Sequence, residues 1–230
     1  LKLSSHIIDK PLAIVDIETT GGNAMYSRII DVAVIRIERG KVVKKFQSLI
    51  NPERFIPPSI EQLTGITNDD VADAPTFRSV ARELFKALEG AVFVAHNDRF
   101  YYSFINNEYR RLGKEFSAKC LCTVKLSRKL FPEHRHHDLN SVIQRHNIVC
   151  EDRHRAMGDA KAVFDFLTVI QDEVTGLLLE KAVRAILRTS SLPSNLDKES
   201  IDALPETPGV YLLYGKEGEV LYVGKSVCIR

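Results

Sequence analysis

The sequence has no tryptophan, two methionines and only four cysteines among its 230 residues. The spacing of Cys120, Cys122, Cys150 and Cys228 matches neither a disulfide framework nor a pair of metal-binding dithiol motifs. We therefore expect reduced thiols and a cytoplasmic protein. No apolar run reaches the roughly 18 residues that a membrane-spanning helix needs, so we expect no membrane partner.

An excess of charge of either sign is also missing. The chain has 32 lysine and arginine residues against 30 aspartate and glutamate residues, a formal net charge of +2. That balance is compatible with a nucleic-acid partner but does not argue for one, because dedicated DNA-binding domains are often far more basic. The first apolar run leads directly into acidic residues, so we expect that this stretch is not a signal peptide. Because the first residue is leucine, we expect a piece of a longer protein.

The sequence does contain a clear change of hydrophobic pattern. Short β-branched runs at 11–18, 29–37 and 42–50 predict three strands, the last two joined by a hairpin turn at 38–41. The later elements are strands at 91–96 and 118–124 and helices at 58–65, 76–90, 98–113, 123–130, 138–147, 159–174 and 177–188. This order predicts an α/β fold in which an antiparallel three-strand meander and parallel strands form one mixed sheet with flanking helices.

The composition predicts three segments along the chain. We expect a first domain at 8–175, a helical and linker segment at 176–205 that is rich in serine, proline and acids, and the incomplete start of a second domain at 206–230. The last of these reads as a hairpin at 209–224, because two apolar strands flank a glycine-containing turn.

Two acids, Asp16 and Glu18, lie at the end of the first predicted strand. Because they are two residues apart, their side chains point to the same face of the sheet. Neighbouring carboxylates repel each other and lose hydration, and a divalent cation relieves both costs. The spacing alone leaves a second interpretation open, in which the two acids contact backbone amides at the strand end.

A third acid, Asp159, lies on the apolar stripe of a long helix. That stripe consists of Ala162, Val163, Phe166, Leu167 and Ile170. A carboxylate among core side chains needs a partner, although an acid near a helix amino terminus also interacts favourably with the helix dipole. His154 lies five residues earlier, a rotation of about 140° on a helix, so we expect it on the preceding loop beside the same site.

These residue types indicate a particular chemistry. Hard carboxylate oxygens favour Mg²⁺ or Mn²⁺, and two such ions stabilise the attacking and leaving oxygens in a phosphoryl displacement. A histidine titrates near neutral pH and is suited to take a proton from water.

The segments DIETTGG, HNDRF and HRAMGDA resemble the three motifs of the DnaQ-like (DEDDh) exonucleases, the family of the proofreading subunit of bacterial replicative polymerase. The resemblance covers 8–175 and implies a ribonuclease H-like fold and a 3′–5′ exonuclease that releases 5′-mononucleotides from DNA. It implies metal binding by Asp16, Glu18 and Asp159 and a general-base role for His154. It further places Thr20, Leu63, Asn97 and Phe100 near the bound nucleotide. The implied partners are DNA 3′ ends and proteins of repair or replication.

Position 101 departs from that family pattern. The second motif ends in an acid, and this chain has Tyr101 there. Asp98, three residues earlier and about 4.5 Å back along the helix axis, is one candidate for the missing metal ligand, or it is the N-cap of the helix. Tyr101 therefore leaves a second function open, a catalytically degraded DNA-binding or docking module. A third is an exoribonuclease that acts on short RNA, since the resemblance implies a fold that serves both polymers.

The carboxyl-terminal hairpin resembles a second family. GVY at 209–211 and YVG at 222–224 are similar to the paired motifs of GIY-YIG nucleases such as the UvrC and Cho repair endonucleases. The catalytic arginine and metal-binding glutamate of that family would follow residue 230. The resemblance implies a bacterial fusion of an exonuclease with a repair endonuclease, and it is the reason to expect DNA rather than RNA.

Three histidines at positions 134, 136 and 137 form a further group. We expect them on a solvated loop, with a zinc site as the alternative.

Overall fold

The computed structural model describes residues 1, 3, 7–188, 200, 203–205, 207–215, 217–227 and 229. Two compact units divide the chain, Leu1–Arg188 and Thr189–Arg230. Residues 189–199, 201 and 202 of the predicted helical and linker segment lie outside the described residues, as does Cys228. The other three cysteines are free thiols. None of the described helices is both long and apolar enough to cross a membrane.

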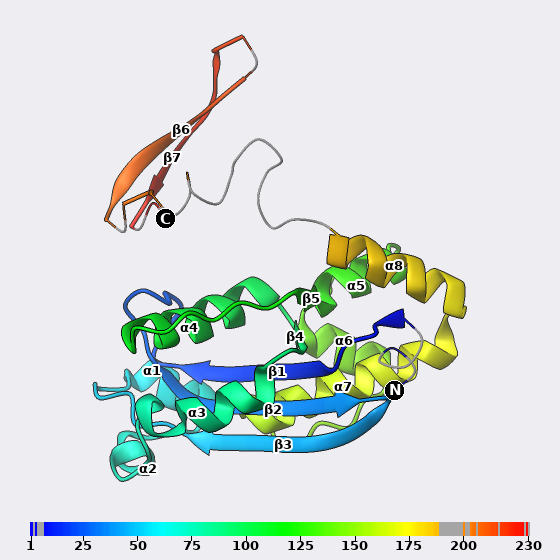
Figure 1. Cartoon of the computed structure of the whole chain (residues 1–230), viewed down its shortest axis with the longest axis horizontal. Coiled ribbons are helices and arrows are strands. Elements are labelled where there is room, and N and C mark those ends of the chain that lie inside the picture. Colours follow the sequence, from blue (N-terminus) through cyan, green and yellow to red (C-terminus); the bar gives the residue numbers. More distant parts are fainter. Residues whose placement is uncertain are drawn as a thin grey trace. The chain divides into compact units, whose positions relative to one another are not determined.

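A five-stranded sheet with the order β3-β2-β1-β4-β5 forms the centre of the first unit (Figure 1). Strands β1 (Leu12–Thr19), β2 (Ile29–Glu38) and β3 (Lys41–Leu49) are antiparallel neighbours. Strands β4 (Val92–Ala95) and β5 (Cys120–Cys122) extend the sheet in parallel from β1. The predicted mixed sheet, an antiparallel meander plus parallel strands, is therefore confirmed.

The turn between β2 and β3 has two residues, Arg39 and Gly40. Both have positive φ, 49° and 80°. This is the geometry of a type I′ turn, whose twist matches that of the two flanking strands. The hairpin predicted at 38–41 is confirmed.

Eight helices are described in the first unit. They are α1 (Pro58–Thr64), α2 (Asn68–Ala72), α3 (Phe77–Leu88), α4 (Asp98–Arg111), α5 (Thr123–Leu130), α6 (Leu139–Arg145), α7 (Ala156–Glu173) and α8 (Gly176–Arg188). All except α2 correspond to predicted helices. The short α2 begins with a capping box, in which Thr67 accepts a hydrogen bond from the Asp70 N–H and Asp70 accepts one from the Thr67 N–H.

Alternation along β1 decides which side chains face which layer. Leu12 and Ile14 pack into the core beneath α7. Ala13, Val15 and Ile17 point to the opposite face, into the core beneath α3 and α4. Because side chains in a strand alternate, Asp16 and Glu18 continue the row of Leu12 and Ile14 on the α7 side.

Helix α8 packs against α5 and β5, and it buries Leu179, Ala182, Val183 and Ile186 in the core on the α7 side. It is therefore part of the first unit. The second unit contains the predicted hairpin, with β6 (Gly209–Tyr214) antiparallel to β7 (Val220–Ser226).

A buried acid, Glu108, ties α4 to the loop that follows β1. Its Oε1 accepts hydrogen bonds from Arg28 Nε at 2.7 Å and Arg111 Nη1 at 3.0 Å. Arg111 Nη2 also donates to the backbone carbonyls of Ala24 at 3.1 Å and Met25 at 2.8 Å. Charge-assisted bonds of this kind are stronger than neutral ones, so the loop is held rigidly at the end of the sheet.

We expect Glu108→Gln to lower the free energy of unfolding by about 2–3 kcal/mol, because it removes a charged, buried acceptor from two arginines. Urea denaturation monitored by circular dichroism measures this change. The matched control is Glu83→Gln, which breaks the Lys44–Glu83 pair at the surface and is expected to cost less than about 1 kcal/mol. Equal losses of unfolding free energy in the two variants would contradict the stabilising role given to Glu108.

Candidate active site

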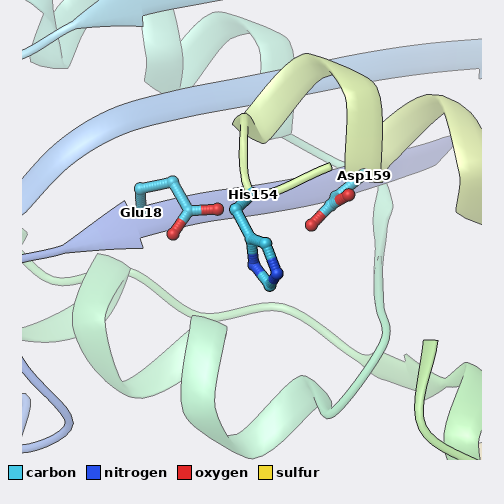
Figure 2. A group of neighbouring side chains, drawn as sticks. All are labelled: Glu18, His154 and Asp159. Carbon is cyan, nitrogen blue, oxygen red and sulfur yellow. The ribbon is translucent and has the colours of Figure 1, made fainter. Parts of the chain in front are cut away.

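Three side chains from separate parts of the sequence meet at the end of β1. Glu18 comes from β1, His154 from the loop before α7, and Asp159 from the first turn of α7 (Figure 2). Their potential ligand atoms all lie within 4.8 Å of one another. Among the described residues, this is the one group of three or more acidic, histidine or cysteine side chains that approach so closely. The predicted convergence of these three residues is present in the structure.

Asp16 lies deeper on the same face of β1 and is 1% exposed. The side chain of Tyr101 reaches its carboxylate from α4. Within the described part of the chain, Asp16 Oδ1 has no hydrogen-bond partner. A buried carboxylate oxygen without a partner is costly, and it is a position where a cation would be stabilising.

Burial and neighbouring negative charges raise the pKa values of two acids of this cluster, Asp16 and Glu18. Burial, followed by the charges of Asp159 and Glu18, raises the pKa of Asp16 well above its usual range. Burial, followed by the charges of Asp159 and Asp31, raises the pKa of Glu18 to about 8. Carboxylates that are so unfavourable as neighbouring anions favour a divalent cation, and their oxygen atoms are the ligands that Mg²⁺ and Mn²⁺ prefer.

Asp31 is a fully buried acid that the sequence reasoning missed. It pairs with Glu18 in the register of β1 and β2. Its Oδ2 accepts hydrogen bonds from the Ala156 N–H at 3.2 Å and from Arg155 Nε at 3.4 Å. Asp31 therefore fixes the amino terminus of α7. The signal was present, because Asp31 precedes the buried Ala33, Ile35 and Ile37 on the same face of a predicted strand.

Arg153 is a second residue that sequence reasoning did not bring to the site. Its guanidinium forms an ion pair with Asp159, and its charge also lowers the pKa values of Asp16 and Glu18. Arg153 Nε donates to Asn140 Oδ1 at 2.8 Å. One fixed positive charge is therefore built into the group of acids.

The loop that carries His154 is held closely against α7. His154 has a φ of 59°, a left-handed conformation that is uncommon for a residue with a side chain and costs of order 1–2 kcal/mol. A Cβ at Gly158 would overlap the carbonyl oxygen of Asp152, so only glycine fits where the loop crosses the first turn. The strain is maintained because the loop and α7 fix His154 between them.

A cavity of about 320 Å³ opens above these residues. Its lining consists of Ile17, Glu18, Thr19, Gly21, Gly22, Ile60, Leu63, Thr64, Phe100, Tyr101, Leu139, Arg153, His154 and Asp159. Two residues expected near the nucleotide, Leu63 and Phe100, are therefore in the lining. Thr20 is buried, with its hydroxyl accepting from the Arg28 N–H at 3.0 Å. Asn97 is exposed at the start of α4, and neither Thr20 nor Asn97 is in the lining.

The structure brings Tyr101 to the acids and leaves Asp98 elsewhere. Asp98 is the first residue of α4 and is not in the cavity lining. Its charge acts instead on Cys120 of β5, where burial and then Asp98 raise the thiol pKa to about 12. The alternative expectation, that Asp98 caps the helix, is wrong, because the N-cap is Asn97 with a φ of 83°.

The histidine of the second motif has a structural role. His96 Nε2 donates to the His137 carbonyl at 2.9 Å, and Nδ1 contacts the Thr123 hydroxyl at 2.9 Å. Burial lowers the pKa of His96 to about 4, so the ring is neutral.

The expectation that residues 134–137 lie on a solvated loop is wrong for His137. It is buried, and its ring nitrogens contact the Ser127 hydroxyl and the His134 carbonyl, which leaves neither for zinc.

Relatives of known description match much of the chain. A Mycobacterium tuberculosis protein described as a candidate bifunctional exonuclease/endonuclease is 32% identical over 231 residues, which cover 94% of this chain and 35% of that protein. The DNA polymerase III subunit epsilon of Aquifex aeolicus is 33% identical over 177 residues, covering 76% of this chain and 87% of that protein. The chain thus spans about a third of the length of the mycobacterial relative.

A solved structure shows the same fold. The nuclease domain of 3′hExo, a DEDDh family member bound to rAMP, superimposes with a TM-score of 0.59 at 21% identity, covering 70% of this chain and 92% of that one. Residues 13–167 match the RNase T family model, which is described as exonuclease. The chain therefore belongs to the RNase T exonuclease family, and its first unit has the ribonuclease H-like fold of the DEDDh members.

Proposed function

We propose that the first unit is a metal-dependent 3′–5′ exonuclease that hydrolyses DNA ends to 5′-mononucleotides. The observation that carries the proposal is the convergence of Glu18, Asp159 and His154 within 4.8 Å in one cavity, with Asp16 beneath them. A structural role explains a single buried acid. It does not explain several acids beside a strained histidine on the wall of a cavity that is large enough for a nucleotide end.

Asp16, Glu18 and Asp159 would hold Mg²⁺ or Mn²⁺ through their carboxylate oxygens. Bound there, the metal supplies charge neutralisation at the phosphate and a lower pKa for water. His154 takes the proton from the water whose oxygen attacks the terminal phosphorus. The bond from phosphorus to the 3′ oxygen of the preceding nucleotide then breaks, and this oxygen leaves and takes a proton from solvent to become the new 3′ hydroxyl. Leu63 and Phe100 present apolar surface in the cavity lining to the terminal nucleotide.

Two considerations favour DNA over RNA as the substrate. The relative from Aquifex aeolicus is named as a DNA polymerase subunit and is 33% identical. The structure bound to rAMP is similar in fold alone, at 21% identity. Replication or repair proteins in the cytoplasm are the corresponding partners. The alternative functions are an exoribonuclease and, because of Tyr101, a DNA-binding or docking module without turnover.

The second unit is proposed as the beginning of a GIY-YIG endonuclease domain. The support is the likeness of 209–211 and 222–224 to the paired motifs of that family, and these segments pair as β6 and β7. The mycobacterial relative, whose description includes an endonuclease, aligns with 94% of this chain. Cleavage of a plasmid by a longer chain that includes the expected catalytic arginine would test this part of the proposal.

We expect His154→Gln to lower the rate of 5′-labelled single-stranded DNA degradation by about 10²–10⁴-fold in Mn²⁺, because the variant lacks the proton acceptor. The products are separated by gel electrophoresis. His134→Gln is the matched control, since His134 is a partly exposed histidine outside the cavity lining. If both variants degrade DNA at the rate of the unmodified chain, His154 is not the general base.

The same assay distinguishes the two candidate acid positions. Asp98→Ala is expected to change the rate by less than about twofold, because Asp98 lies outside the cavity lining. Tyr101→Asp is expected to raise the rate at least about tenfold by adding a ligand. Loss of activity in Asp98→Ala would show that the acid had moved. Activity in none of the three chains would favour the binding module.

Stability should depend on pH through Glu18. Because the pKa of Glu18 is raised from 4.5 to about 8, the folded protein binds a proton that the unfolded chain has lost between these values. This contribution therefore stabilises the metal-free protein at low pH and is lost as pH rises toward about 8. The unfolding free energy of the unmodified chain minus that of Glu18→Gln, measured with urea in EDTA, should fall across this window. A difference that rises with pH would contradict it.

A further inference from the structure

Tyr101 occupies the deep end of the acid cluster, next to Asp16. Its ring packs edge-on against Phe100, with ring centroids 5.4 Å apart, and joins the core beneath α3 and α4. Its hydroxyl lies beside the Asp16 carboxylate. A neutral phenol contributes no negative charge, and its ring fills the position where the family pattern has a carboxylate.

The ligand atoms that approach one another most closely are at the other end of the cluster. Glu18, His154 and Asp159 form the group within 4.8 Å, and Asp16 is outside it. Figure 2 shows these three side chains projecting from β1, the preceding loop and α7 into the same space. One focus of ligand atoms is therefore present among the described residues, and Asp16 lies outside it, beside Tyr101.

The net charge of the acid cluster also matches one divalent cation. When ionised, Asp16, Glu18 and Asp159 contribute three negative charges. The guanidinium of Arg153 is always protonated and is ion-paired with Asp159, which leaves two negative charges. Asp31 is matched by Arg155 and adds nothing to the net charge. A single divalent cation neutralises the cluster, whereas a second would leave excess positive charge at a partly buried site.

We infer that the site of this chain binds one divalent cation, between Glu18 and Asp159 beside His154, and that Tyr101 prevents the binding of a second. The inference rests on the proposed function and narrows it, because a metal-dependent nuclease of this family type is otherwise expected to use two ions. Tyr101 and Arg153 together limit the number of bound cations to one. Tyr101 stands where a further carboxylate would be needed, and Arg153 supplies a positive charge.

The test counts Mn²⁺ ions on the intact 230-residue chain by isothermal titration calorimetry, with electron paramagnetic resonance of free Mn²⁺ as a second measure. One ion is expected for the unmodified chain and for Tyr101→Phe, which keeps the ring and adds no acid. Two are expected for Tyr101→Asp, with the spectrum of a spin-coupled pair. Asp159→Asn, as the control for weak surface binding, should lose the single site.

Two ions on the unmodified chain overturn the inference and leave the proposed function intact. No ion on the unmodified chain overturns both. One ion on a folded Tyr101→Asp overturns the role assigned to Tyr101. If Tyr101→Asp does not fold, as circular dichroism would show, the count for the unmodified chain still decides whether the site binds one ion or two.

Discussion

The burial of carboxylates on one face of β1 is the constraint on which the rest of the site depends. An ionised carboxylate within a core is costly, so each needs a compensating group. Different elements supply these groups. Tyr101 on α4 lies beside Asp16, and Arg153 on the loop before α7 pairs with Asp159. The first N–H of α7 donates to Asp31. The acids thereby hold α4, α7 and the intervening loop against the sheet, and the cavity is the space that these elements leave.

Much of this arrangement could be read from the sequence because burial acts locally. The alternation that places Leu12 and Ile14 on one face also places Asp16 and Glu18 there, whatever the rest of the chain does. The helical stripe that contains Asp159 is likewise confirmed, with that acid 5% exposed among buried apolar neighbours. A short helix such as α2, which has no apolar stripe of useful length, gives a much weaker signal, and its capping box was the only indication of it.

The partners of the acids were not predictable, because they depend on contacts between distant segments. Asp31 and the Ala156 N–H are 125 residues apart in the sequence. The direction of a long arginine side chain such as Arg153 is set by Asn140 and Asp159, which no local pattern brings together. Helical geometry predicted that the side chains of Asp98 and Tyr101 point in similar directions, because these residues are three positions apart. In the structure, Asp98 begins the helix near β5, and only Tyr101, almost one turn later, reaches Asp16.

Tyr101 belongs to the core as well as to the acid cluster. Its ring contacts are lost if aspartate takes its place, and a further carboxylate is then added beside Asp16. Tyrosine at position 101 therefore favours the stability of the fold, whereas aspartate there favours cation binding. Tyrosine and aspartate codons differ only in their first base. A single base substitution is enough to convert one form of the domain into the other, so a gene for either form lies one mutational step from its alternative.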